Sequence, residues 1–573
     1  MAIAGAPSAP AEHPAPDVER EGADARLVGW LQRRATWIFA GLLAADLVLL
    51  LYFGRGTTFF YDDWDFVLHD YGGGIHTLLV AHVGNISILP VAVYKVLFHL
   101  VGLNHYTVFR LVVIVLHLIS AALVYVLASR RVQPLTALLA ASLIMFLGAA
   151  WEDLLWGFQV GYMLSIAGGL AAWTLLDVPG RRNDILASLC LIVSACSSSL
   201  GIAVLIGVAA ELVWRRDLRR LWVPALPALI YLIWYAGHGE SQVTKASLIA
   251  APGYAGDLAA AAFGALVGHG LDWGRPLAAI AVIGLLWWLG GRSKASSRLV
   301  GLLAAGLSLW VLTAVARSTI SPAESSRYTY LGAVVIVLTA VELLRGRVWS
   351  PRVSLVACAL VLYFAFNGLT LMHSGSQSLR SISKVIKAEL GGLELAAAHA
   401  PPGYEPDNQR APQLTAGPYL HAVRSIGSSP ADTPQQLLTT DPLSRNAADK
   451  VMVALDAPQL ATAPATPASP GAPAPGVVSV TGGVALTRGR CVEVKPTTGA
   501  AAVVVTLPGG GVLLHDSGAA GATMGLRRFG EPFEPLAQPL PGRSTRTLVI
   551  PPDTSQIPWQ LQIASSSPTA VCG

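Results

Sequence analysis

The chain has 573 residues, of which 53% are hydrophobic and only 13% are charged, with a formal net charge of +5 and a mean hydropathy of +0.55. Soluble globular domains are roughly a quarter charged, so this composition excludes an ordinary soluble protein. Apolar runs of about 15–20 residues recur between Ala35 and Leu371, and a helix needs that length to cross a hydrocarbon core of about 30 Å. We therefore expect a polytopic α-helical membrane protein.

The apolar runs predict about eleven transmembrane helices that follow a disordered cytoplasmic tail, residues 1–34. The predicted spans are residues 35–53, 107–127, 134–150, 160–176, 184–199, 201–214, 221–236, 276–289, 299–316, 328–344 and 353–372. Arginine clusters such as Arg130-Arg131 and Arg215-Arg216 fall on one side of this count, which the positive-inside rule places in the cytoplasm. Residues 257–269 are apolar enough to cross, but a crossing there would move the later Arg clusters outward. We therefore expect an interfacial or re-entrant helix at 257–269.

The first outer loop, residues 54–106, contains an acidic pair, Asp62 and Asp63, among aromatic residues that include Trp64. Two adjacent carboxylates at a membrane surface are unfavourable, because they lose hydration and repel each other. A functional role for the pair is therefore one interpretation, and a solvated loop without a function is the alternative. Further along, His82 and Asn85 lie at a break between two apolar pieces, where a side chain can point into a cavity. The second apolar piece contains Lys95, and both pieces suit the membrane interface.

The second predicted outer loop is short, acidic and aromatic, with Glu152, Asp153, Trp156 and Gln159. Carboxylates and amides bind vicinal hydroxyls, and flat aromatic faces cover the apolar side of a sugar ring. An aromatic belt at the membrane interface is the alternative reading of Trp156. This loop is therefore a candidate for sugar recognition.

The third predicted outer loop places Arg317 and Arg327 outside, against the positive-inside bias. Arg binds phosphate through two parallel hydrogen bonds. Lipid head groups are an equal alternative for Arg317, whereas Arg327, followed by Tyr328 and Tyr330, favours a binding role.

Together these loops resemble the GT-C superfamily of polytopic glycosyltransferases, such as the protein O-mannosyltransferases, lipid A aminoarabinose transferases and mycobacterial arabinofuranosyltransferases. The resemblance covers the membrane part, roughly Ala35 to Met372. The residues that carry it are Tyr61-Asp62-Asp63-Trp64-Asp65-Phe66, His82-Val83-Gly84-Asn85, Trp151-Glu152-Asp153-Leu154-Leu155-Trp156-Gly157-Phe158-Gln159 and Ser326-Arg327-Tyr328-Thr329-Tyr330.

The resemblance implies a sugar donor on a polyprenyl phosphate, bound from the outer leaflet, and transfer to an acceptor hydroxyl, usually with inversion. It implies that Asp62 or Asp63 is the general base, and a positioned carboxylate contributes about 10²–10⁴-fold in rate. The phosphate leaving group needs positive charge, for which the candidates are Arg327, Arg317 and Lys95. A divalent cation held by Asp62, Asp63 and His82 is the alternative source of charge; we expect no dedicated metal site. No P-loop is present, so a nucleotide sugar is not the expected donor.

After Met372 the pattern changes. Residues 376–398 have helical periodicity, 401–444 predict irregular structure, and 461–476 form an Ala/Pro-rich linker. Residues 477–573 predict a small extracytoplasmic β-sandwich, with strand-like runs at 477–480, 491–494, 501–507, 511–514, 545–550 and 559–563. The predicted organisation is therefore a tail at 1–34, a catalytic membrane domain at 35–375, a helix and linker region at 376–476 and the β-module.

The β-module contains two cysteines, Cys491 and Cys572, and an oxidising compartment favours a disulfide between them over two free thiols. Cys190, Cys196 and Cys358 lie within predicted spans and are expected to act as small apolar residues.

These features predict a plasma (inner) membrane enzyme with a cytoplasmic N-terminus, a lipid-linked sugar donor, and a cell-envelope glycan or lipid as acceptor. Arabinose and mannose are both compatible sugars. The alternative is a transporter or flippase of lipid-linked sugars, which would more often show internal repeats and charges near the bilayer midplane. A scaffold or polymer-binding protein is the third hypothesis, and it leaves Asp62 and Asp63 unexplained.

Overall fold

The computed structural model describes residues 16–70, 73–82, 84–291, 295–456, 458–462, 474–497, 499–507, 510–551 and 553–573. The chain folds into two compact units that interleave in sequence. The first, here called the helical unit, comprises Met1–Gly54, Leu78–Ala92 and Arg110–Ser376. The second, the mixed unit, comprises Arg55–Thr77, Val93–Phe109 and Gln377–Gly573. Residues 1–15, the start of the predicted tail, lie outside the described part.

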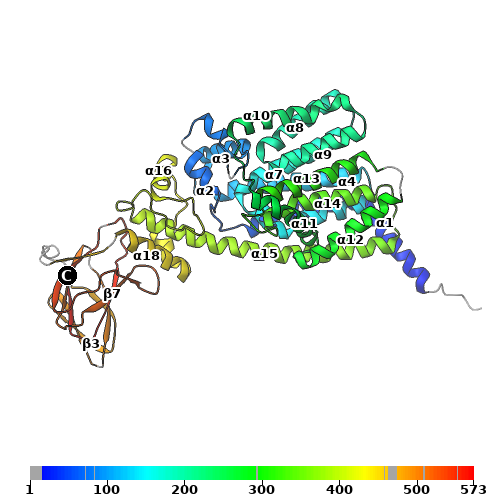
Figure 1. Ribbon diagram of the computed structural model, residues 1–573. Coiled ribbons are helices and arrows are strands. Elements are labelled where there is room, and N and C mark those ends of the chain that lie inside the picture. The colour runs from blue at the N-terminus through cyan, green and yellow to red at the C-terminus, as the bar shows by residue number, and fades with distance from the viewer. Residues whose placement is uncertain are drawn as a thin grey trace, which may run out of the picture. The chain divides into compact units, whose positions relative to one another are not determined.

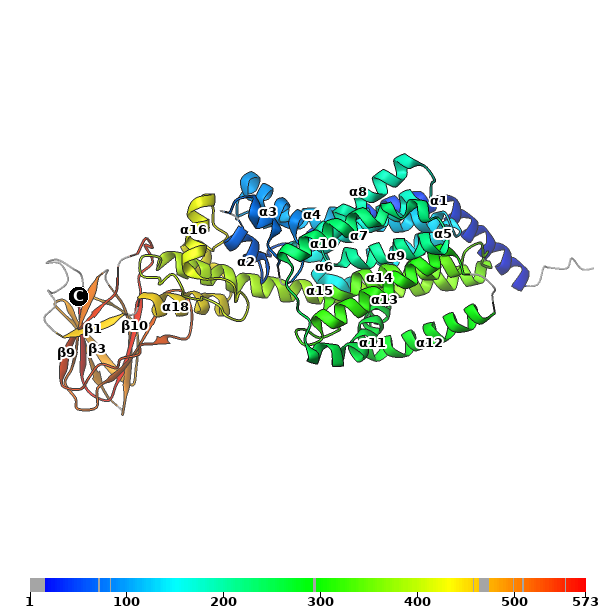
Figure 2. The same ribbon diagram turned by 45° about the horizontal axis from the view of Figure 1, so that its top comes forward.

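Helices make up most of the chain, and the long helices of the helical unit run side by side as a bundle (Figures 1 and 2). The α-helices are α1 (Pro16–Phe53), α2 (Asp63–Asp65), α3 (Ile88–Val101), α4 (Tyr106–Ser129), α5 (Pro134–Met145), α6 (Trp151–Leu155), α7 (Val160–Leu176), α8 (Arg181–Ser197), α9 (Leu200–Trp214), α10 (Trp222–His238), α11 (Lys245–Val267), α12 (Leu271–Gly290), α13 (Ser297–Arg317), α14 (Thr329–Leu343), α15 (Pro351–Leu395), α16 (Ala416–Ile426), α17 (Pro434–Thr439) and α18 (Pro442–Asp456). Single turns of other helix types are η1 (Phe66–Asp70), η2 (Ile75–Leu79), η3 (Gly148–Ala150), η4 (Gly157–Gln159), η5 (Leu218–Arg220) and η6 (Ser326–Tyr328).

Ten helical segments among the described residues are long and apolar enough to cross a membrane, as expected of a multi-pass membrane protein. They are Asp24–Phe53, Tyr106–Ser129, Pro134–Leu155, Gly157–Leu176, Leu218–His238, Lys245–Val267, Leu271–Gly290, Ser297–Arg317, Ser326–Leu343 and Pro351–Leu395. This set differs from the eleven predicted spans at three helices. Helices α8 and α9 are only 17 and 15 residues long, and α11 joins the set.

Helix α11 covers the segment predicted to be interfacial. A Thr244–Ser247 capping box starts it, and Gly268, with φ of 72°, ends it in the left-handed region that glycine favours. Its residues Ala251 and Leu258 pack with Ala314 and with Ala323, which lie at and beyond the last turn of α13. By length and composition α11 can cross a membrane, but these contacts gather at one end of α13. The interfacial placement stays a prediction.

A buried ionic cluster joins helix ends at the Arg-rich side of the bundle. Arg298, at the start of α13, donates to Asp177 Oδ1 at 2.8 Å and to Glu211 Oε2 at 2.7 Å. Arg131 donates to Asp177 Oδ1 at 2.9 Å and also pairs with Glu342. Arg298 is 4% exposed and Glu211 2% exposed, so these two charges are stabilised by each other and not by solvent. The cluster therefore fixes the ends of α4, α7, α9, α13 and α14 to one another.

The first-loop segments fold together with the C-terminal half of the mixed unit. The Thr58 N–H donates to Ser383 Oγ at 3.1 Å, across 325 residues of sequence. The Leu103 N–H donates to Ser428 Oγ at 2.8 Å. These contacts show that residues 55–77 and 93–109 are built into the same unit as α16 and its neighbours.

The β-region of the mixed unit consists of two antiparallel sheets, ordered β1-β9-β6-β11-β4-β3 and β2-β5-β10-β7-β8. Alternate residues such as Val492 and Val494 of one sheet and Val503 and Val505 of the other share one buried core. The strands are β1 (Gln459–Thr462), β2 (Gly476–Thr481), β3 (Gly483–Arg488), β4 (Cys491–Pro496), β5 (Ala501–Thr506), β6 (Gly511–Asp516), β7 (Ala522–Arg527), β8 (Glu534–Pro535), β9 (Ser544–Val549), β10 (Gln560–Ser565) and β11 (Thr569–Cys572). All six predicted strand-like runs coincide with strands, and the predicted all-β region is confirmed.

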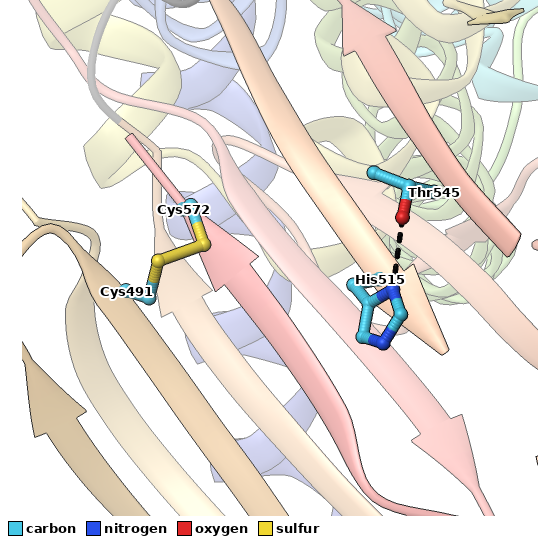
Figure 3. The surroundings of a disulfide bond; sticks show 4 residues. All are labelled: Cys491, His515, Thr545 and Cys572. Carbon is cyan, nitrogen blue, oxygen red and sulfur yellow. Dashed lines mark hydrogen bonds between the residues drawn. A yellow bond between two sulfur atoms is a disulfide. The ribbon is translucent and has the colours of Figure 1, made fainter. Parts of the chain in front are cut away.

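The predicted disulfide is present. Cys491 opens β4, Cys572 closes β11, and the two residues are register partners with Cα atoms 4.0 Å apart (Figure 3). In the same sheet His515 Nδ1 and Thr545 Oγ1 lie 2.9 Å apart across β6 and β9 (Figure 3).

The segments between the last predicted span and the sheets are more helical than the sequence suggests. Helix α15 runs unbroken over 45 residues, so the predicted span at 353–372 and the predicted helix at 376–398 form one helix. Residues 401–444, expected to be irregular, contain α16, α17 and the start of α18. Residues 16–34, expected in the disordered tail, belong to α1. The predicted linker lies mostly outside the described residues, at 463–473.

Candidate functional site

Asp63 is a buried carboxylate with three donors. It opens the short helix α2 and is 0% exposed. Its Oδ2 accepts the Tyr106 hydroxyl and the Phe60 N–H, both at 2.9 Å, and its Oδ1 accepts the Tyr94 hydroxyl. Burial and the adjacent Asp63 charge raise the pKa of Tyr94 well above its ordinary value, so Tyr94 stays a donor. This arrangement satisfies the charge of Asp63 inside the protein.

The surroundings of Asp63 are aromatic. The ring of Phe59 packs edge-to-face on Tyr106 at 4.8 Å and on Phe109 at 5.1 Å. Trp64, predicted to contact substrate, is itself 0% exposed and packs against Tyr419 at 5.9 Å. Trp64 therefore belongs to the core of the mixed unit and offers no open face to a sugar.

Asp62 has a different environment from its neighbour. Its side chain is half-buried, and its Oδ1 accepts the Gln413 Nε2–H at 3.2 Å. Gln413 lies in the segment between α15 and α16, which Asp407 braces by accepting the N–H groups of Gln409 and Arg410, each at 2.9 Å. Burial alone would raise the pKa of Asp407, but these bonds and the Arg410 guanidinium outweigh it and hold the pKa below its ordinary value. A braced loop thus carries the residue that orients Asp62.

Lys95, predicted to bind phosphate, lies on α3 in the mixed unit and donates from Nζ to the Gly73 carbonyl oxygen at 2.8 Å. That bond fastens α3 to the preceding loop. Arg317 and Arg327, the other two predicted phosphate ligands, belong to the helical unit.

The helical unit contains a cavity of about 730 Å³ between α9, α10 and α13. Most of its wall is apolar, from residues such as Ala209, Pro224 and Leu312. The polar residues that line it are Asn85, Tyr162, Ser199, Tyr231, Tyr235, Glu240, Ser241, Gln242, Thr313, Arg317 and Tyr328.

These polar residues gather at one end of the cavity. Glu211, near the end of α9, accepts a hydrogen bond from Arg298 at the start of α13, which shows that the two helices are antiparallel. The start of α9 therefore lies beside the end of α13, where Arg317 stands. The cavity is thus apolar along most of its length and polar at one end, where the predicted residues Asn85, Arg317 and Tyr328 lie.

His82 and Asn85 form a tight turn, with two backbone hydrogen bonds between them at 3.0 and 2.9 Å. Gly84, with φ of 73°, allows the chain to reverse there. The turn directs Asn85 to the cavity, while His82 is 7% exposed and is not among the residues that line it.

Arg327 and helix α6, which replaces the start of the predicted second outer loop, are joined by a small set of hydrogen bonds. The Arg327 N–H donates to Glu152 Oε2 at 3.0 Å, and the Glu152 N–H donates to Ser326 Oγ at 3.0 Å. The Arg327 guanidinium lies 5.5 Å from the centre of the Tyr328 ring. The structure thus brings together Glu152, Arg327 and Tyr328, and their roles toward sugar and phosphate stay predictions.

Asp153 lies beside this set and is 0% exposed. Neither of its carboxylate oxygens has a hydrogen-bond partner among the residues that the structure describes. It lines a second, small cavity of about 10 Å³ together with Tyr162, Arg327, Tyr328 and Tyr330. Gln159, also predicted to bind substrate, is 1% exposed, and Trp156 is buried and stacks on Phe158 at 5.3 Å.

Sequence reasoning missed a buried polar triad in the bundle. His117 of α4 bonds Asp46 of α1 through Nε2 at 3.0 Å and the Tyr330 hydroxyl through Nδ1 at 2.7 Å. All three side chains are at most 2% exposed. The sequence does contain a signal for this triad, since Asp46 and His117 are each an ionisable residue in an otherwise apolar stretch of a predicted span. Such residues are rare in membrane-spanning segments and usually have a functional role. Tyr330, predicted to contact substrate, is the third member.

The predicted site residues divide between the two units. Asp62, Asp63, Trp64 and Lys95 belong to the mixed unit, and the others of the membrane part belong to the helical unit. No group of three or more His, Cys, Asp or Glu side chains suited to a metal ion occurs in the described ranges. In comparisons with known proteins, no family model matches this chain, and no curated protein matches it significantly.

Proposed function

We propose that this protein is an extracytoplasmic glycosyltransferase of GT-C type, which moves a sugar from a polyprenyl phosphate to a cell-envelope glycan or lipid. The observation that carries the proposal is the cavity of about 730 Å³, which is apolar along α9, α10 and α13 and polar at the end where Arg317 lies. A polyprenyl phosphate has the matching chemistry, because an apolar chain ends in an anionic head that carries the sugar.

The cavity supports a lipid more than a small polar ligand. From Ser199 to Ala209 its wall follows ten residues of chain, about 15 Å along a helix axis. That length takes a few isoprene units in extended form, and the remaining chain would lie in the bilayer. Burying apolar chain contributes about 25 cal/mol per Å², so even this stretch supplies several kcal/mol of binding.

At the polar end of the cavity the donor phosphate binds Arg317. Hydrogen-bonding groups for the sugar come from Asn85, Tyr162, Glu240 and Tyr328. Guanidinium binding to a phosphate stabilises the charge that builds on the leaving group as the glycosidic bond breaks. Arg327, fastened by Glu152, provides a second positive charge in the same unit.

Asp62 is the proposed general base. It takes the proton of the acceptor hydroxyl while that oxygen attacks the anomeric carbon and the phosphate departs, which inverts the configuration in one step. Asp63 is the poorer candidate, since its oxygens already accept three hydrogen bonds and it is fully buried. Its proposed role is to hold the turn that presents Asp62.

The proposed location is the plasma (inner) membrane, with the N-terminus in the cytoplasm and the mixed unit outside. The ionic cluster supports this orientation, since it gathers Arg131, Arg298 and Arg215 at one side of the bundle. The disulfide supports an oxidising surrounding for the β-region.

A transfer assay in lipid tests the function. Purified full-length protein is offered a panel of polyprenyl-phosphate sugars and a cell-envelope glycan extract, with Asp62→Asn, Asp63→Asn and Arg317→Gln compared with the wild type. We expect Asp62→Asn to lose about 10²–10⁴-fold in turnover at unchanged donor binding and thermal stability, and Arg317→Gln to weaken donor binding. Asp63→Asn should act mainly through lower stability. Turnover that is equal in Asp62→Asn and wild type contradicts the assignment of the base.

A transporter of lipid-linked sugars is the second candidate, and the buried Asp46–His117 pair favours it. Ionisable residues inside a span commonly mark ion or proton pathways. The same cavity would then carry the lipid rather than present it to an acceptor. Donor movement across proteoliposome membranes without sugar transfer, insensitive to Asp62→Asn, would establish transport and contradict the transferase.

A further inference from the structure

The buried triad and the Asp153 cavity adjoin through one residue. Tyr330 accepts or donates at His117 Nδ1, and it also lines the small cavity beside Asp153. Asp46, at the far end of the triad, lines another small cavity with Phe53, Gly148 and Met372. Asp153 therefore lies at the same small cavity as Tyr330, and Tyr330 is hydrogen-bonded through His117 to Asp46.

The direction of the hydrogen bonds follows from the chemistry of the ends. An ionised Asp46 only accepts, so the Nε2 of His117 must carry the proton that is donated to it. In a neutral His117 the Nδ1 is then the acceptor, and the Tyr330 hydroxyl donates to it. The chain is ordered Tyr330 to His117 to Asp46, and His117 has room for one further proton at Nδ1.

Asp153 is the group that can supply that proton. Both its oxygens are buried without a partner among the residues described, which is costly for a charged carboxylate. The cavity it shares with Tyr330 has a volume of about 10 Å³, about what a single water molecule needs. One water in this cavity would bridge the Asp153 carboxyl group and the Tyr330 hydroxyl.

We propose that Asp153, Tyr330, His117 and Asp46 form a proton relay inside the bundle, which stores on His117 a proton taken from Asp153. In the forward step Asp153 gives its carboxylic proton to the Tyr330 oxygen as the Tyr330 proton moves to His117 Nδ1. The products are an Asp153 carboxylate and a His117 imidazolium paired with the Asp46 carboxylate. One O–H bond breaks and one N–H bond forms, and the net charge of the four groups is unchanged.

The relay sets the charge that faces Arg327. With the proton on Asp153, Arg327 faces a neutral acid and is available to an anionic ligand such as phosphate. With the proton on His117, the Asp153 carboxylate competes for the same guanidinium. The other titratable or charged groups around Asp153 are Glu152, Tyr162 and Tyr328, while the elements around Asp46 present apolar residues apart from His117.

Infrared difference spectroscopy on the full-length protein in lipid tests the relay without reference to sugar transfer. The band of a protonated buried carboxyl is assigned to Asp153 by its loss in Asp153→Asn, and is then followed against pH. In His117→Gln and Tyr330→Phe the relay cannot take the proton, so the band should persist to a higher pH than in the wild type. Tyr254→Phe is the matched control, because its hydroxyl bonds the Ser321 carbonyl outside the relay, and it should follow the wild type.

The same experiment can overturn the proposal. Equal pH dependence in the wild type, His117→Gln and Tyr330→Phe would mean that these hydrogen bonds are structural only. The lack of any Asp153 band between pH 4 and 9 (a range of about five units around ordinary carboxyl and imidazole values) would also reject it. Tyr330→Phe keeps the volume of the side chain and carries the test if His117→Gln does not fold.

Discussion

At the scale of single residues, neighbours in sequence differ because their hydrogen-bond partners differ. Asp63 is enclosed by the Phe60 N–H and two tyrosine hydroxyls, whereas Asp62 bonds Gln413 from a segment about 350 positions away. Hydrogen bonds to a buried carboxylate are worth more than those between neutral groups, since the alternative is an uncompensated charge. Asp63 therefore holds the turn, whereas Asp62 is half-buried and bonds a residue from a distant segment.

Removing one donor should expose this structural role. Tyr106→Phe deletes the 2.9 Å bond to Asp63 and leaves the ring in place, so we expect a loss of about 1.5–3 kcal/mol in the free energy of unfolding. Equilibrium unfolding in detergent measures it. Tyr363→Phe is the control because Tyr363 is 52% exposed. An equal change in both variants would show that the Asp63 bond contributes nothing.

At the scale of elements, the ionic cluster joins helix ends that the sequence separates widely. Arg298 connects α13 to both α7 and α9, through Asp177 and Glu211. Breaking a buried ion pair by removing one partner costs more than the pair itself contributes, because the other partner stays buried with its charge. The cluster is thus a weak source of net stability but a strong constraint on which helix ends meet.

Arg298→Met should therefore destabilise the bundle by about 3–5 kcal/mol, since Glu211 and Asp177 lose a buried partner. Arg219→Met, at an exposed position beyond α9, provides the control with the same loss of charge. The measurement is the melting temperature of each variant in the same detergent. Similar melting temperatures for Arg298→Met and wild type would show that water or lipid head groups replace the guanidinium.

Asp177 gives the cluster a dependence on pH. Burial alone would raise the pKa of Asp177, but Arg298 and Arg131 outweigh burial and hold it below its ordinary value. A carboxyl with a lowered folded pKa stabilises the fold above its unfolded value, about 3.9, and loses that contribution as the pH falls through the folded value. The wild type should thus exceed Asp177→Asn in melting temperature at pH 7, and the difference should shrink below about pH 4. A difference that is constant with pH would contradict this assignment.

At the scale of the whole molecule, the chain forms two units whose boundary is not a single point in sequence. Residues 55–77 and 93–109 belong with residues 377–573, while residues 78–92 between them belong to the helical unit. The disulfide closes the last strand of the mixed unit onto β4 and so ties down the end of the β-region.

The disulfide should contribute to stability mainly by restricting the unfolded chain. Cys491 and Cys572 are 81 residues apart, and the chain-entropy model gives about 4 kcal/mol for a loop of that size. The double variant Cys491→Ala, Cys572→Ala should lose about that much free energy of unfolding in its β-region, which differential scanning calorimetry would detect as a lower melting temperature. Cys358→Ala, a free cysteine on α15, should not. A β-region equally stable in both variants would contradict the model for this loop.

The sequence predicts local features of this fold better than pairings at long range. Strands β4, β5 and β6 are short runs rich in Val and Leu between Gly and Pro turns, and such runs are recognisable in the sequence. Strand β3 is not, because Val484 and Leu486 are largely exposed at a sheet edge and offer no buried face. Helix α16 follows a Pro-rich stretch that predicts a loop. The helix forms because its buried residues pack within the mixed unit, and that packing is not evident from the sequence.

The candidate site shows the same limit. The acidic pair and Arg327 stand out by residue type, but burial separates Asp63 and Trp64 from open chemistry, and burial is a property of tertiary structure. Asp46 and His117 are single polar residues in apolar spans, and only their contact with each other and with Tyr330 reveals a shared purpose.

The long-range bonds of residues 55–77 and 93–109 also impose a delay on folding during synthesis. At about 5–20 residues per second, the 325 residues between Thr58 and Ser383 take roughly 15–65 s to be added. For that interval Trp64 and Phe59 have no Tyr419 or α15 to cover them, and their rings are among the largest that the finished protein buries. Slower translation lengthens the interval, so yield should depend on elongation rate and on factors that shield nascent aromatic segments.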